Sequence, residues 1–105
     1  NLLAKWKQPV PATPVTVELR VLRIGDFALV SMAGEPFAEI GQAFKKASPF
    51  AVTMFCGYSS GQGGDYMPIA TEYPHGGYEI ERTPYGTGAA EKLMLQAPRL
   101  FALVK

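Results

Sequence analysis

Carboxylate and phenol side chains occur together in two stretches of the sequence. Glu35 stands in the stretch "GEPF", directly after an apolar segment. The glycine-rich stretch "GYSSGQGGDYMPIATEYPHGGYE" carries four of the five tyrosines, Tyr58, Tyr66, Tyr73 and Tyr78, and Tyr85 follows closely. A carboxylate can take a catalytic or ligand role, whereas a phenol can donate to a developing oxyanion or, when deprotonated, bind a metal. Because glycines permit positive φ angles and close backbone approach, the loop can aim Asp65 and Tyr66 at a common target.

Each of these features also has a purely structural interpretation. A helix amino terminus would stabilise the Glu35 carboxylate, buried tyrosines usually pack with a solvated hydroxyl, and the loop could simply cover the surface. A phosphate-binding loop is a weaker alternative, because the stretch lacks the P-loop lysine and the glycine spacing of a dinucleotide fingerprint. The residue types therefore leave a catalytic or metal site and a structural role both open.

Several other chemistries are disfavoured by the residues present. His75 is the only histidine and stands between a proline and two glycines, so we expect a turn and no self-contained zinc site of ordinary composition. Cys56 is the only cysteine, and its apolar neighbours in "FAVTMFC" suggest a small buried hydrophobe. Ser59 and Ser60 have no base or orienting partner nearby in the sequence, which argues against a local nucleophilic triad.

An antiparallel hairpin is predicted for the first half of the chain. Residues 15–24, "VTVELRVLRI", alternate apolar and polar side chains with the period of a half-exposed strand. Gly25 and Asp26 form a two-residue turn, and residues 27–33, "FALVSMA", return as a more uniformly apolar strand that we expect to be covered on both faces.

A strand–helix–strand crossover is predicted next. Pro36 suits the first turn of a helix, apolar residues recur at helical spacing through Phe44, and the helix ends at Ser48 and Pro49. Residues 50–56 form a short apolar run, which we interpret as a buried strand parallel to the preceding one. The segments that follow the two parallel strands, Glu35 and the glycine-rich loop, should then meet at one edge of the sheet.

The fold class predicted is α/β, with a small mixed sheet and a C-terminal helix. Thr87 can cap a helix over "GAAEKLMLQ", and Pro98 either kinks this helix or starts a second one. The chain is predicted to be a single domain over residues 1–105, with a helix tail and a proline-rich connector at 1–14, and to be a fragment of a larger catalytic domain.

Composition excludes two classes of partner. Apolar residues make up 48% of the chain, charged residues 18%, and the net charge is +1 with both signs interspersed. This balance is typical of a folded chain, and it provides no basic surface for nucleic acid or an anionic membrane. No apolar run approaches the roughly 18–20 residues that a membrane span needs.

Four motifs in the same order resemble a known family. The stretches "GEPF", "GYSSGQGGDYMPIATEY" and "GGYEIERTPYG", followed by a helix that begins "AAEKL", resemble the late part of the catalytic domain of the neutral/alkaline, non-lysosomal ceramidases. The closest resemblance is to short bacterial members, and it runs from about Val15 to the end of the chain. The order and spacing of the motifs carry it, because no single motif would be specific.

The resemblance implies a zinc-dependent hydrolase of sphingolipid metabolism, an amidase that cleaves an N-acyl, ceramide-like amide bond. Glu35 and Tyr66 then correspond to two zinc ligands, and Tyr78 corresponds to the tyrosine that holds the oxyanion. The substrate implied is an N-acyl lipid or a related amide, and the family's location is secreted or periplasmic.

The remaining two zinc ligands of that family are upstream histidines, which this chain lacks. We therefore expect the missing upstream part of the same domain to be a partner, and the isolated chain of 105 residues to bind zinc weakly and to be inactive. The alternative is a non-catalytic interaction or scaffold domain, in which Glu35 caps a helix and the tyrosines pack.

Overall fold

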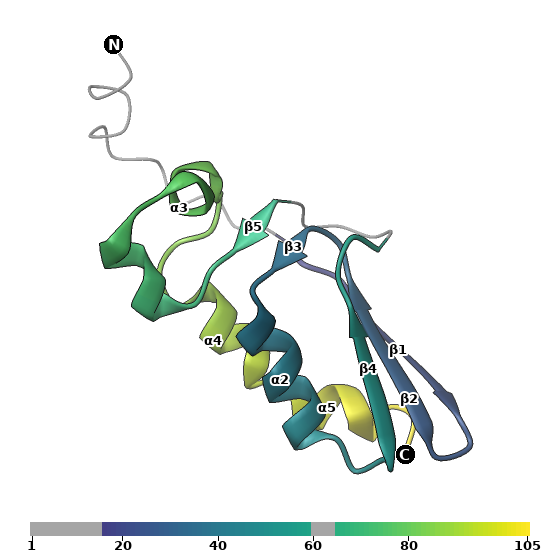
Figure 1. The fold of residues 1–105 in the computed structure, drawn as a ribbon. Coiled ribbons are helices and arrows are strands. Elements are labelled where there is room, and N and C mark those ends of the chain that lie inside the picture. The colour runs from purple at the N-terminus through teal and green to yellow at the C-terminus, as the bar shows by residue number, and fades with distance from the viewer. Residues whose placement is uncertain (1–15, 60–64) are drawn as a thin grey trace.

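The computed structural model describes residues 16–59 and 65–105 as a small α/β fold (Figure 1). Its elements in chain order are β1 (Leu19–Ile24), β2 (Phe27–Met32), β3 (Glu35–Pro36), α2 (Ala38–Ala47), β4 (Val52–Cys56), β5 (Tyr66–Met67), the 3₁₀ helix η1 (Ala70–His75), α3 (Tyr78–Arg82), α4 (Ala89–Met94) and α5 (Ala97–Ala102). The predicted fold class is confirmed. The helix tail and connector predicted at 1–14 lie outside the described residues.

The larger sheet has three strands in the order β1-β2-β4. β1 and β2 form the predicted antiparallel hairpin, with Ile24 opposite Phe27 across a turn in which Gly25 has a φ of 59°. β2 and β4 are parallel and are joined through α2, so the strand–helix–strand crossover is also confirmed. A parallel connection of this kind places the carboxyl ends of β2 and β4 at the same edge.

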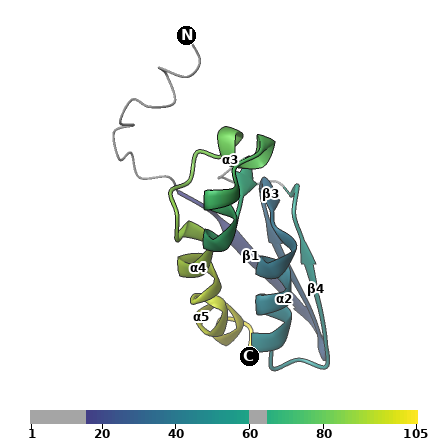
Figure 2. The ribbon, with the colours of Figure 1, turned by 60° about the vertical axis from the view of Figure 1, so that its left-hand side comes forward.

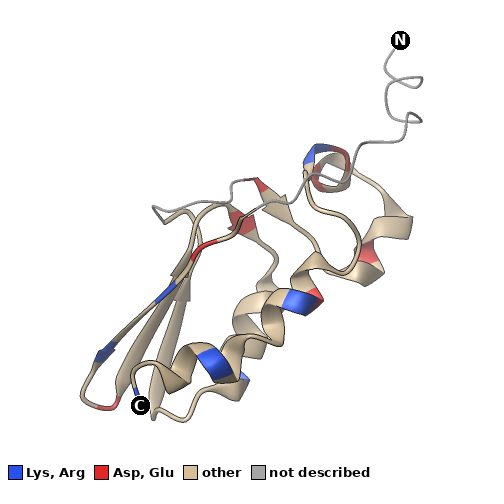
Figure 3. Cartoon of the chain, turned by 180° about the vertical axis from the view of Figure 1, so that it is seen from behind, with Lys and Arg blue, Asp and Glu red and all other residues tan. Residues whose placement is uncertain are grey.

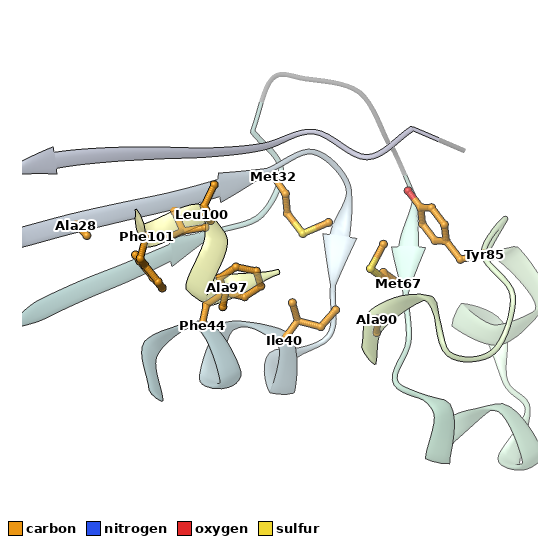
Figure 4. Close-up of a cluster of buried hydrophobic side chains, with 11 residues drawn as sticks. Ala28, Met32, Ile40, Phe44, Met67, Tyr85, Ala90, Ala97, Leu100 and Phe101 are labelled. Atoms are coloured by element: carbon orange, nitrogen blue, oxygen red, sulfur yellow. The ribbon is translucent and has the colours of Figure 1, made fainter. Parts of the chain in front are cut away.

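Helices α2, α4 and α5 cover one face of this sheet (Figure 2). Alternate residues of β2 point toward them, and Ala28, Val30 and Met32 are almost fully buried. Phe44 of α2 packs in the centre, with ring centroids 5.3 Å from Phe55 and 6.4 Å from Phe101. Figure 4 shows this cluster continuing past Met32 to side chains under the second, smaller sheet.

The opposite, outer face of the sheet is covered by no described element. The strand registers bring six apolar side chains together on it: Leu22, Ile24, Phe27, Leu29, Val52 and Met54. Met54 and Val52 are about half exposed, so β4 is an exposed edge strand and not the buried strand that its apolar run predicts. The prediction that β2 is covered on both faces is also wrong, because apolar composition does not say which layers exist.

The smaller sheet joins two segments far apart in sequence. β3 and β5 are parallel, with Glu35 paired to Tyr66 and Pro36 paired to Met67. This sheet lies beyond the carboxyl ends of β2 and β4, next to α3 (Figure 1).

Two predicted helix boundaries differ from the structure, and a third agrees with it. Pro36 belongs to β3, and α2 begins at Ala38 with Phe37 as its N-cap, so Glu35 is not the helix cap of the scaffold interpretation. The pairing of β3 with β5 overrides the local preference of proline for a first helical turn. Thr87 caps no helix, because Gly88 takes the N-cap position of α4. Pro98 lies in the first turn of a second short helix, α5, as one of the two alternatives predicted.

Candidate functional site at the β3–β5 sheet

Glu35 and Tyr66 stand opposite each other in the β3–β5 sheet. The backbone N–H of Glu35 donates to the carbonyl of Asp65 over 2.9 Å, and that of Phe37 donates to the carbonyl of Met67 over 3.2 Å. Paired residues of neighbouring strands point to the same face of a sheet. The carboxylate and the phenol are therefore neighbours on one face, although 30 residues of chain separate them.

Tyr66 is supported on its other side by the segment after α3. The Thr83 hydroxyl donates to the Tyr66 carbonyl over 2.6 Å and accepts the N–H of Tyr85 over 3.1 Å. Tyr78, the first residue of α3, places its ring 5.8 Å from the Tyr66 ring at an interplanar angle of 77°. The structure thus brings together all three predicted site residues, with Tyr66 between Glu35 and Tyr78.

Tyr58 joins this group from the end of β4. Its hydroxyl donates a hydrogen bond to Oε1 of Glu35. The backbone N–H of Tyr58 donates to the carbonyl of Gly34 over 2.8 Å, which ties the end of β4 to the turn before β3. Gly57 makes this approach possible, because a Cβ at that position would lie 2.9 Å from Cδ of Pro36.

The phenols near Glu35 hold their protons more strongly than free tyrosines. Desolvation raises the pKa of Tyr66 above its ordinary value of 10.0, the charge of Glu35 adds to this, and Arg82 acts weakly in the other direction. For Tyr58 the hydrogen bond to Glu35 is the largest cause of a raised pKa. Both phenols are therefore neutral donors at neutral pH unless a cation displaces their protons.

A hollow of about 360 Å³ lies beside the Glu35–Tyr58 pair. The pair forms one wall, and Gly41 and Lys45 of α2 with Phe55 of β4 form others. Its size is at the lower end of the range for small-molecule sites. The hollow gives the Glu35 side of the site an opening between α2 and the edge strand.

The histidine, cysteine and serine residues considered in the sequence analysis do not form a catalytic or metal site with one another. His75 is exposed at the end of η1, and Cys56 is partly buried at the end of β4. The Ser59 hydroxyl donates to the carbonyl of Gly57 over 3.3 Å, and Ser60 lies outside the described residues. Among residues 16–59 and 65–105, no three His, Cys, Asp or Glu side chains gather as a metal site.

Two oxygen atoms on this face suit a cation. Oε1 of Glu35 accepts the Tyr58 hydroxyl, whereas Oε2 accepts no hydrogen bond from the described part of the chain. The phenol of Tyr66 is the second donor and must lose its proton to bind a metal. Zinc is most often held by four ligands, so these residues fit half of a zinc site.

The sequence assigned no role in the site to Tyr58, one of its five tyrosines, or to Thr83. The signal for Tyr58 was its place directly after Gly57 at the end of an apolar run, at the same sheet edge as Glu35. Thr83 stands in the "TPYG" stretch, but its contact with the Tyr66 carbonyl depends on tertiary structure.

Comparison of the chain with protein-family models, curated proteins and solved structures finds no match. Across the described part of the chain, no helix combines the length and the apolar character that crossing a membrane requires. The function has to be argued from the site itself.

Proposed function

We propose that the chain is part of a zinc-dependent amidase that hydrolyses an N-acyl, ceramide-like amide bond. One observation carries the proposal: Glu35 and Tyr66, the two positions that correspond to zinc ligands by resemblance, are directly paired in the β3–β5 sheet. The strand–helix–strand crossover predicts only that Glu35 and the glycine-rich loop lie at one edge of the sheet, whereas the structure pairs these two residues directly. Their adjacency is what a shared metal requires.

Each residue of the group has a role in this proposal. Glu35 and Tyr66 would hold the metal, and Tyr66 would release its proton on binding, so that affinity for the metal rises with pH. Tyr78 would donate its phenol proton in a hydrogen bond to the oxyanion of the amide carbonyl, an effect typically worth about 3–4 kcal/mol. The edge-to-face contact between the rings of Tyr66 and Tyr78 keeps this donor beside the metal-binding face.

A bound zinc ion would supply a Lewis acid that makes water a nucleophile near neutral pH. The two remaining ligands would be the upstream histidines implied by the resemblance. The chain of 105 residues alone is therefore proposed to be inactive.

The experiment replaces Tyr66 by phenylalanine in a polypeptide that also carries the two histidines. Loss of one ligand oxygen should weaken zinc binding by more than the roughly 10- to 100-fold that loss of a supporting residue costs, and amide hydrolysis should fall with it. Zinc content after dialysis and hydrolysis of an N-acyl substrate are the measurements.

Thr53→Val is the matched control, because the Thr53 hydroxyl hydrogen-bonds Ser48 and not Glu35 or Tyr66. It should leave zinc content unchanged. Equal zinc content and equal hydrolysis in wild type and Tyr66→Phe would sink the proposal.

A second candidate, an interaction domain, is favoured by the apolar outer face of the β1-β2-β4 sheet. β2 and β4 carry no charged residue (Figure 3), and the exposed fractions of Leu22, Ile24 and Met54 are 54%, 64% and 51%. Strand spacing makes this face roughly 14 Å by 17 Å. A second copy of the chain could cover it, with the Arg20–Glu18 ion pair at one end of the face, although an interface of this size is small and would be weak.

Sedimentation of the isolated chain at increasing concentration tests this candidate. Wild type should dimerise, and Met54→Lys should shift it toward monomer, because a lysine on this face would have to be desolvated. Thr71→Lys, at an exposed site on η1, is the control. A wild type that stays monomeric at every concentration would remove the support for an interaction domain of this kind.

A further inference from the structure

We propose that Tyr58 is a positioning residue that holds Oε1 of Glu35, so that Oε2 is the oxygen presented to a cation beside Tyr66. This inference rests on the function proposed above and deepens it. Nothing in the sequence motifs assigns a role to Tyr58, and its contact with Glu35 appears only in the tertiary structure.

The backbone holds Tyr58 in a conformation that tyrosine rarely adopts. Its φ of 56° lies in the left-handed region, which costs free energy in any residue with a Cβ. Two hydrogen bonds over-determine this conformation: Tyr58 N–H to the Gly34 carbonyl at 2.8 Å, and Ser59 N–H to the Met32 carbonyl at 3.0 Å. Such strain is typical of residues whose side chain must be aimed at a fixed point.

Core packing does not explain this placement. The Tyr58 side chain is 79% exposed, and its ring belongs to none of the buried aromatic contacts. The hydrogen bond to Glu35 is the contact that orients the side chain. The strained backbone of Tyr58 is therefore better explained by the effect of its phenol on the Glu35 carboxylate than by packing.

A fixed carboxylate is useful to a metal site because a ligand that rotates freely loses entropy on binding. A hydrogen bond to one carboxylate oxygen fixes the plane of the group and leaves the other oxygen for the cation. The Tyr58 hydroxyl donates to Oε1 of Glu35, whereas Tyr66, on the neighbouring strand, is the phenol that must lose its proton to bind a metal. In this proposal Tyr58 holds the carboxylate in place, and Tyr66 binds the metal.

The first arm of the test uses the chain of 105 residues without metal. NMR order parameters of the Glu35 side chain at neutral pH should fall in Tyr58→Phe compared with wild type, because the hydrogen bond that fixes the carboxylate is lost. Thr53→Val is the control, since the Thr53 hydroxyl hydrogen-bonds Ser48 and not Glu35. An equally ordered Glu35 side chain in wild type and Tyr58→Phe would overturn the inference.

The second arm measures zinc affinity in a polypeptide that carries the two histidines. Tyr58→Phe removes only the hydroxyl and should weaken zinc binding by roughly 10- to 100-fold. Thr53→Val removes a hydroxyl that hydrogen-bonds Ser48 and should leave zinc affinity unchanged. Melting temperatures of both variants report whether a change in affinity reflects folding.

The outcomes separate the two proposals. Zinc bound equally well by wild type and Tyr58→Phe would overturn the positioning role and leave the proposed function intact. A wild type that binds no zinc would overturn both.

Discussion

Gly57 is the residue on which the geometry around Glu35 depends most closely. A Cβ added there would lie 2.9 Å from Cδ of Pro36 and 3.3 Å from the carbonyl oxygen of Gly34, and neither the ring nor the backbone can move freely. The same carbonyl accepts the N–H of Tyr58. The absence of a side chain at one position thus lets the end of β4 approach the turn before β3.

Gly57→Ala is predicted to destabilise the chain by about 1–3 kcal/mol, because the added methyl group would push Pro36 and Gly34 away. Gly86→Ala is the matched control: nothing lies within 4 Å of a Cβ at that position. It should be neutral or slightly stabilising, since alanine restricts the unfolded chain. Denaturant unfolding of the two variants measures the difference, and equal stabilities would show that the close approach is not required.

At the scale of elements, β5 is a strand of two residues that could not persist alone. It pairs with β3 on one side, and on the other the Thr83 hydroxyl donates to the Tyr66 carbonyl. The Tyr73 hydroxyl then fixes the following segment through the carbonyl of Tyr85 at 2.9 Å. The "TPYG" stretch therefore acts as a brace for the strand that carries Tyr66.

Thr83→Val is predicted to cost about 1–3 kcal/mol, because the isosteric side chain neither donates to Tyr66 nor accepts from Tyr85. Thr87→Val tests the corrected helix boundary at the same time. Thr87 is exposed and caps no helix, so this variant should lie within about 0.5 kcal/mol of wild type. Thermal unfolding distinguishes the two. A larger loss of stability in Thr87→Val than in Thr83→Val would contradict the supporting role of the Thr83 hydroxyl.

At the scale of the whole molecule, the tyrosines whose phenol pKa is raised lie at the end of the fold away from the hairpin turn. The pKa values of Tyr58, Tyr66, Tyr73 and Tyr85 are all raised above 10.0; for all but Tyr58 the main cause is desolvation. A group whose pKa is higher in the folded than in the unfolded state stabilises the fold only while it is protonated in both. These four tyrosines therefore make the free energy of unfolding depend on pH in the alkaline range.

The contribution of these tyrosines to the free energy of unfolding is predicted to be constant below about pH 10, the ordinary pKa of a phenol, because they are protonated in both states. Above that pH the unfolded state loses protons first, so stability should fall until the folded-state pKa values are passed. Denaturant unfolding at a series of alkaline pH values, together with phenolate absorbance, measures the effect. Stability that rises with pH across this window would mean that the phenols are not desolvated.

The sequence by itself determined the local elements of this protein. Alternation and a Gly-Asp turn identified the hairpin, and helical spacing that ends at Ser48 identified α2 and the parallel strands it connects. These signals are readable because each depends on residues close together in the chain. The resemblance of its motifs to the ceramidase family, and not local pattern, singled out Glu35, Tyr66 and Tyr78 as the expected site residues.

Tertiary structure decided how those pieces meet. The pairing of β3 with β5 took Pro36 out of the helix and set Glu35 opposite Tyr66, and no local pattern contains that register. It also exposed β4, because burial of an apolar strand depends on which layers lie against it. Tyr58 reached Glu35 by the close approach at Gly57, a contact between segments distant in sequence. Local residue preferences determine which segments form helices and strands, whereas long-range packing and hydrogen bonding determine which of these elements lie next to each other.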